Sequence, residues 1–180
     1  MKQEYIITIF SENNIGLLNR ITINFTRRKI NIESLTVSQS AISGISKFII
    51  VVNETEERVK RLVAQLDKIV DVLKTFYHTS KDMIFAEIAM YKISTEFIYG
   101  SDELGEIVRN SGAQIVEITK DFIIIEKSGH KKETQELFDK LNKFGVMQFV
   151  RSGRIAVTRD RIERLSEFLK VRDNNLEKTN

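Results

Sequence analysis

The apolar residues of this chain change their spacing in a regular order, and that order is the strongest constraint on its fold. Alternation at every second residue is typical of strands, and recurrence at every third and fourth residue is typical of helices. Over residues 5–77 the order is strand, helix, strand, strand, helix, strand, and it repeats over residues 84–158. We therefore predict an α+β chain built from two tandem ferredoxin-like βαββαβ domains.

The expected elements follow from this spacing. The strands of the first repeat are predicted at residues 5–10, 31–38, 47–52 and 70–77, with helices starting after Gly16 and Thr55. The strands of the second are predicted at residues 84–93, 114–119, 122–127 and 147–158, with helices at 102–111 and 131–143. We place the first domain at residues 1–78, a linker at 79–83, the second domain at 84–159, and an amphipathic carboxy-terminal helix with a frayed tail at 160–180.

Composition excludes several kinds of chemistry. The 180 residues contain no Cys, which removes disulfides, thiolate metal sites and thiol nucleophiles and suits a reducing cytoplasm. They also contain no Pro, although average usage of about 5% would give roughly nine. Every turn must therefore be made without a fixed φ, by residues such as Gly, Asn, Ser and Asp.

Charge and hydropathy argue against nucleic acid and membranes as partners. The net charge of +3 includes only one tight basic run, at residues 27–29, and no aromatic residues interleave with arginines as in a base-stacking surface. The apolar runs are as short as strands, too short for a membrane helix or a signal peptide. We expect a cytoplasmic protein.

Catalytic constellations are also missing from the sequence. Neither His78 nor His130 has a Ser or carboxylate neighbour at a spacing that indicates an activated nucleophile, so we expect both to be solvated and structural. Two histidines without Cys do not make up a metal site, and no glycine-rich phosphate-binding motif occurs. We expect no catalytic residue, no metal and no cofactor on this chain.

The loop at residues 13–16 does have the chemistry to bind a ligand. It precedes a predicted helix, whose free N–H groups and positive dipole end suit a carboxylate. Asn13 offers an amide, Gly16 allows close backbone approach, and Asn31 could accept a bond from an ammonium group. Judged on these residues alone, helix capping by Asn13 or Asn14 with a tight turn at Gly16 is the simpler explanation.

Two strings in this region resemble one family closely. Asn-Asn-Ile-Gly-Leu-Leu-Asn-Arg-Ile at residues 13–21 and Asn-Ile-Glu-Ser-Leu-Thr-Val at residues 31–37 are similar to the amino-terminal ACT domain of acetolactate (acetohydroxyacid) synthase small subunits. Leu-Asp-Lys-Ile-Val-Asp-Val-Leu at residues 66–73 and Arg-Ser-Gly-Arg-Ile-Ala at residues 151–156 extend the resemblance to about residues 3–160.

The resemblance implies a regulatory subunit rather than an enzyme. Such subunits activate a large catalytic subunit, which carries thiamine diphosphate, Mg and FAD, and they mediate feedback inhibition by a branched-chain amino acid, usually valine. The effector lies between the ACT domains of a homodimer, with Asn31 contributing from the second copy, so a ligand role replaces simple capping. The expected effector-binding residues are Asn13, Asn14, Ile15, Gly16, Leu17, Asn31, Val37 and Ser38.

The chain departs from the family pattern at three positions. Ile15 stands where Pro or Ser is common, and Ala86 replaces an Arg beside Glu87. Lys29 replaces a glycine, so the first helix must end without its usual left-handed residue.

Two alternative functions remain. One is a free-standing ACT regulator of another enzyme or of transcription, and the other is an autonomous enzyme, which the missing acid, base and nucleophile disfavour.

Overall fold

The computed structural model describes residues 1–97, 103–160 and 165. The chain divides into two compact units, one made of Met1–Ile84 with the described residues from Ala156 onward, and the other of Phe85–Ile155. The boundary thus falls inside one long strand, β5 (Met83–Ser94), and the chain crosses between the units twice.

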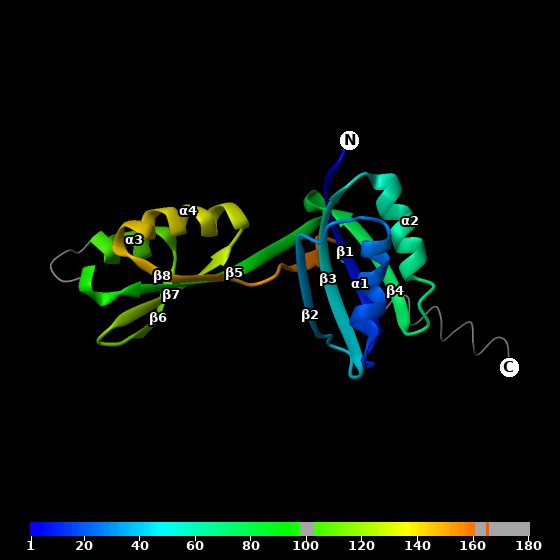
Figure 1. The fold of residues 1–180 in the computed structure, drawn as a ribbon, viewed down its shortest axis with the longest axis horizontal. Coiled ribbons are helices and arrows are strands. Elements are labelled where there is room, and N and C mark those ends of the chain that lie inside the picture. The colour runs from blue at the N-terminus through cyan, green and yellow to red at the C-terminus, as the bar shows by residue number, and fades with distance from the viewer. Residues whose placement is uncertain (98–102, 161–164, 166–180) are drawn as a thin grey trace. The chain divides into compact units, whose positions relative to one another are not determined.

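The first unit has a four-stranded antiparallel sheet with two helices (Figure 1). Its elements are β1 (Gln3–Glu12), α1 (Leu17–Arg27), β2 (Ser34–Gln39), β3 (Ile45–Glu54), α2 (Glu56–Leu66) and β4 (Val72–Thr79), followed by a 3-10 turn at Ser80–Asp82. The strands lie in the order β2-β3-β1-β4, so β1 is central and β2 is an edge strand.

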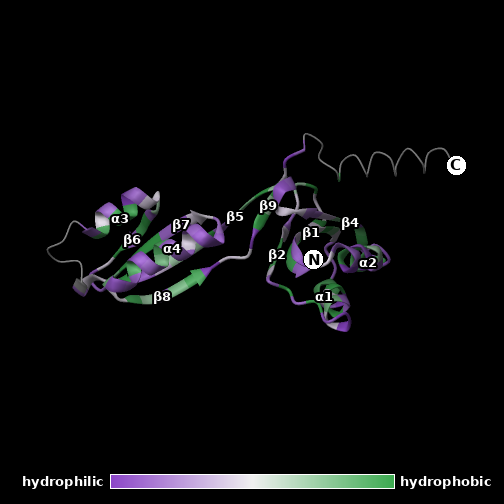
Figure 2. Ribbon diagram, turned by 90° about the horizontal axis from the view of Figure 1, so that it is seen from above, coloured by the Kyte–Doolittle hydropathy of each residue, from purple (hydrophilic) through white to green (hydrophobic). Residues whose placement is uncertain are grey.

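Alternate residues of β1 and β3 build the core of the first unit against both helices. The apolar side chains that α1 and α2 contribute recur at helical spacing, and the helices show a mixture of hydrophobic and hydrophilic residues, as expected where one side packs on a sheet (Figure 2). Core residues include Tyr5, Ile7, Ile9, Leu17, Ile21, Phe25, Phe48, Ile50, Val59, Leu62 and Leu66.

The second unit repeats this topology. Its sheet runs β6-β7-β5-β8, with β6 at Gln114–Ile118, β7 at Phe122–Gly129 and β8 at Val146–Arg151. Its helices are α3 (Glu103–Ser111) and α4 (Lys131–Leu141), with 3-10 turns at Thr95–Phe97 and Asn142–Phe144. Its core gathers Tyr91, Ile93, Leu104, Ile125, Leu137 and Leu141. The predicted α+β fold of two βαββαβ repeats is therefore confirmed.

Two local expectations are wrong. The strand predicted at residues 147–158 is two strands, β8 and β9 (Ile155–Thr158), because the side-chain Oγ of Ser152 accepts the N–H of Ile88 at 2.9 Å and interrupts the regular ladder. The first helix does end with a left-handed residue, since Lys29 itself adopts φ 52°. This conformation costs an ordinary residue roughly 1 to 2 kcal/mol, which explains why glycine is the usual choice here.

The carboxy-terminal helix predicted at residues 160–180 lies outside the described residues apart from Asp160 and Leu165, and Leu165 is helical and buried. Among the residues that the structure describes, no helix combines the length and apolar composition needed to cross a membrane.

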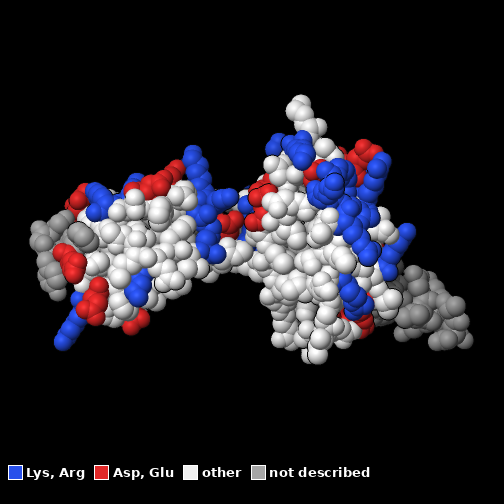
Figure 3. All heavy atoms as spheres, in the orientation of Figure 1, with Lys and Arg blue, Asp and Glu red and all other residues white. Residues whose placement is uncertain are grey.

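Figure 3 shows basic side chains gathered over part of the first unit, with acidic ones beside some of them. On α2, Arg58, Lys60 and Arg61 are each paired with a carboxylate, from Glu54, Glu56 and Glu57 respectively. These ion pairs reduce the positive field that a phosphate backbone would require.

Candidate functional site

The loop between β1 and α1 is exposed and is shaped by one left-handed residue. Gly16 adopts φ 82° and ψ −4° at the N-cap position, and no side chain caps α1. Capping by Asn13 or Asn14, the simpler explanation from sequence, is therefore wrong. A Cβ added to Gly16 would meet no heavy atom within 4 Å, so glycine is required for its backbone conformation, while the space beside it is open.

The amino-terminal end of α1 suits a negatively charged ligand. Its first turn carries no acidic side chain, whereas α2 and α4 carry Glu56, Glu57 and Glu133 in theirs. A carboxylate at a helix N-terminus interacts favourably with the helix dipole. At α1 no acidic side chain of the first turn takes this position. The N–H of Leu17 already donates to the carbonyl of Asn14 at 3.3 Å.

The side chain of Asn14 is held by the turn that precedes β4. Its Nδ2 donates to Oδ1 of Asp71 at 2.9 Å, and the guanidinium of Arg20, on α1, donates to Oδ2 of the same carboxylate. The bonds from Arg20 and Asn14 lower the pKa of Asp71 below its ordinary value of 3.8. Asp71 thus joins the loop, the helix and the turn.

Neither Asp71 nor Arg20 was predicted from sequence. Both lie in the strings that carry the family resemblance, but Asp71 is 57 residues from Asn14 and 51 from Arg20. Local spacing gives no indication of such a pairing.

The other predicted site residues fall into two places. Val37 and Ser38 lie at the same end of the sheet as the loop, because Ser38 is opposite Lys47, which is opposite Phe10. Asn31 lies past the far end of α1, beside Glu33, whose Oε1 accepts its Nδ2 at 2.8 Å. An 11-residue helix is about 16 Å long, so one chain does not bring Asn31 to Gly16.

Leu17 and Ile15 differ sharply in exposure. The side chain of Leu17 is buried in the core, so only its backbone is available to a ligand, whereas Ile15 is fully exposed beside Gly16. The residue that replaces the usual Pro or Ser therefore presents its whole apolar side chain to the surroundings.

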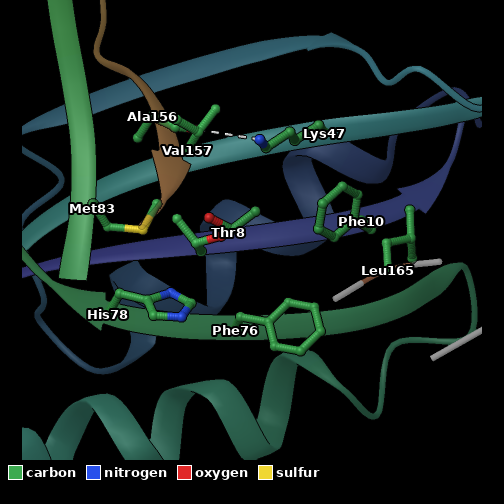
Figure 4. A pocket seen from close by; sticks show the side chains of 10 residues that line it. Thr8, Phe10, Lys47, Phe76, His78, Met83, Ala156, Val157 and Leu165 are labelled. Atoms are coloured by element: carbon green, nitrogen blue, oxygen red, sulfur yellow. Dashed lines mark hydrogen bonds between the residues drawn. The ribbon is translucent and has the colours of Figure 1, made fainter. Parts of the chain in front are cut away.

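A small cavity lies on the sheet face opposite the helices (Figure 4). Its volume is about 120 Å³, and it is lined by Thr8, Phe10, Lys47, Phe76, His78, Met83, residues 156–158 of β9, and Leu165. Nζ of Lys47 donates to the carbonyl of Ala156 at 3.2 Å. None of the predicted effector-binding residues lines this cavity, and His78, expected to be solvated, is buried there.

The described residues contain no group of three or more His, Asp or Glu side chains arranged to hold a metal ion. His130 stands at the start of α4, where its backbone N–H donates to Oε2 of Glu133 at 2.6 Å. Its position is that of a helix N-cap residue.

Comparison of the sequence and the fold with known proteins identifies the family of this chain. Residues 7–74 match the family model described as an AHAS small subunit-like ACT domain, and residues 86–160 match the one described as the small subunit of acetolactate synthase. The acetolactate synthase small subunit of Bacillus subtilis is 34% identical over 155 residues, which cover 86% of this chain and 90% of that protein. The chain belongs to the acetolactate synthase small subunit family.

Other acetolactate synthase small subunits are similar to this chain over most of its length. The small subunit of Aquifex aeolicus is 28% identical over 158 residues, covering 88% of this chain and 82% of that one. The crystal structure of the acetolactate synthase small subunit from Thermotoga maritima superimposes with a TM-score of 0.80 at 23% identity, covering 89% of this chain and 99% of that chain. That likeness supports the two-unit fold.

Replacing Asp71 with Asn tests the network behind the loop. Because the pKa of Asp71 is lowered in the folded state, its carboxylate stabilises the folded protein at pH values above about 4, and this contribution is lost as the pH falls through the lowered pKa. We expect Asp71→Asn to destabilise the protein in urea unfolding at pH 7, and the difference from wild type to shrink as the pH falls below about 4.

The control is Asp121→Asn, at an exposed position in the turn between β6 and β7. It should change stability little at either pH. An Asp71→Asn deficit that is equally large at pH 7 and pH 3 would contradict the role assigned to this carboxylate.

Proposed function

We propose that this chain is the regulatory subunit of a cytoplasmic acetolactate synthase, which activates the large catalytic subunit and confers feedback inhibition by valine. Family membership along both units carries the proposal. Thiamine diphosphate, Mg and FAD are assigned to the catalytic subunit. The match of residues 86–160 to the small-subunit family disfavours a free-standing ACT regulator, which would have no need of that second unit.

The effector site is proposed at the loop of residues 13–16. The α-carboxylate of valine would bind backbone N–H groups at the start of α1, where Gly16 leaves open space and no acidic side chain competes. The exposed side chain of Ile15 and the edge-strand residues Val37 and Ser38 lie at the same end of the unit. They would contact the apolar part of the ligand.

A second copy is needed to bring Asn31 to this site. The edge strand β2 is short and pairs only with β3 among the described strands. Two copies that join their β2 edges antiparallel, about a twofold axis, would place the Asn31 end of one copy beside the loop end of the other. The side-chain oxygen of Asn31 would then accept a hydrogen bond from the ammonium group of valine.

Regulation follows as a shift between dimer arrangements. A ligand that bridges two copies favours the arrangement it binds more tightly, by no more than its difference in affinity. A coupling of about 1 to 3 kcal/mol corresponds to roughly a 5- to 150-fold change in activity or affinity.

Reconstitution with the large subunit tests the proposed function. The protein is mixed with the thiamine-dependent large subunit of the same organism, and acetolactate formation is measured with and without valine, leucine and isoleucine. We expect the small subunit to raise the rate and valine to reduce it toward the rate of the large subunit alone. No stimulation of the large subunit would refute the proposal.

Two substitutions test the placement of the effector. Gly16→Ala strains the loop at a positive φ, and Asn31→Ala removes the acceptor for the ammonium group, a charge-assisted bond worth about 1.5 to 3 kcal/mol. We expect each to weaken valine binding, measured by calorimetry, by roughly 10- to 100-fold while the dimer persists. Gly112→Ala, which places the same strain at φ 65° beyond α3, is the control and should bind valine normally.

A further inference from the structure

The Arg-Ser-Gly-Arg-Ile-Ala motif of residues 151–156 is not explained by effector binding. It lies where the chain returns from the second unit to the first, and β5 carries the outward crossing. Arg151, Ser152 and Arg154 of the motif each contact β5. The motif therefore joins the two crossings at the level of side chains.

A buried ion pair forms the centre of this junction. Glu87 on β5 and Arg154 of the motif are each only 5% exposed, and Nε of Arg154 lies 3.4 Å from Oε1 of Glu87. The guanidinium of Arg151 adds a second positive charge, with its Nε 3.8 Å from Oε2 of the same carboxylate. A buried carboxylate of this kind depends on its partners, because charge is costly to remove from water.

Two further contacts hold the same stretch of chain. The guanidinium carbon of Arg154 lies 4.0 Å from the ring centre of Phe85, two residues before Glu87 on the same side of β5. Ser152 forms two bonds with the backbone of Ile88: its N–H donates to the carbonyl at 2.8 Å, and its Oγ accepts the N–H at 2.9 Å.

The position of this cluster in the chain is its most informative property. Phe85 and Glu87 are the first and third residues of the second unit, and Arg154 is the residue before its last, so the cluster ties together the two points where the chain enters and leaves. A single strand could connect two units as a free linker. Here a buried ion pair fixes the two crossings to each other on the second unit's side of the boundary.

We propose that Glu87, Arg154 and Ser152 form a clasp that couples the effector-sensing unit to the second unit. The clasp residues are positioning residues, because none of them belongs to the proposed effector-binding set. The clasp makes the two crossings a single mechanical connection, through which the state of the first unit reaches the rest of the complex. This inference rests on the proposed function, because it assigns the path of the valine signal.

The test separates effector binding from effector response. Glu87→Gln removes the negative charge, and the double variant Glu87→Met with Arg154→Met replaces the ion pair with apolar side chains of similar size, a change that buried ion pairs commonly tolerate. Ser152→Ala, at an exposed position, removes the acceptor for the Ile88 N–H together with the local bond that the hydroxyl donates to the carbonyl of Gly153. Each is assayed as the full complex with the large subunit.

We expect all three variants to bind valine with unchanged affinity in calorimetry. In the two ion-pair variants, inhibition by valine should fall from a factor within about 5 to 150 to nearly one, and Ser152→Ala should lose part of it. Glu103→Gln, which breaks an exposed ion pair with Lys143 in the same unit, is the control and should keep full inhibition.

Hydrogen exchange supplies a readout that needs no effector. The amides of Ile88 and Ser152 should lose protection in the ion-pair variants and keep it in Glu103→Gln. If the ion-pair variants fold and keep full inhibition by valine, the clasp is overturned. If they fail to fold, Ser152→Ala decides: full inhibition together with unchanged amide protection would overturn the clasp. Absence of activation by the wild-type protein would instead refute the proposed function, and it would be seen before any variant is tested.

Discussion

The register of β1 is the constraint on which the proposed effector site depends. Its residues Tyr5 to Ser11 are all buried, and ten consecutive positions pair with β3. Alternate side chains face the helices and the opposite side of the sheet, so a shift by one residue would exchange Ile7 and Ile9 with Thr8 and Phe10. Because the strand is fixed in this way, the loop that follows it emerges at one defined place.

The loop itself is then held by polar contacts rather than by packing. Asn13 donates its N–H to the carbonyl of Gly44, and Asn14 is held by Asp71. Its residues remain exposed, which leaves the start of α1 accessible to a ligand. A rigid strand beneath an accessible loop is a common way to position a binding site.

The sequence predicted the elements well because their patterns are local. The period of the apolar residues identified every described α-helix and the order of helices and strands along both units, apart from the division of the last strand into β8 and β9. It did not reveal the left-handed Lys29, the carboxylate of Asp71, or the Glu87 and Arg154 pair. Each of the two side-chain pairings joins residues more than 50 positions apart. Such contacts are decided by topology, and a one-dimensional pattern does not contain them.

The contribution of Asn31 from a second copy was predicted only through family resemblance, and within one chain Asn31 lies far from the loop. The proposed effector site must therefore be shared between two copies of the chain. One position affected by the absence of proline is in the loop of residues 13–16, where Ile15 stands in place of a residue that is often proline in the family.

A complementation experiment tests the shared site most directly. Gly16→Ala and Asn31→Ala dimers are each prepared, shown to bind valine weakly, then mixed and allowed to exchange subunits. A mixed dimer combines the intact loop of one copy with the intact Asn31 of the other, so the account predicts that calorimetry recovers tight binding at about one site per four chains. A mixture that exchanges subunits but recovers no tight valine binding would contradict it.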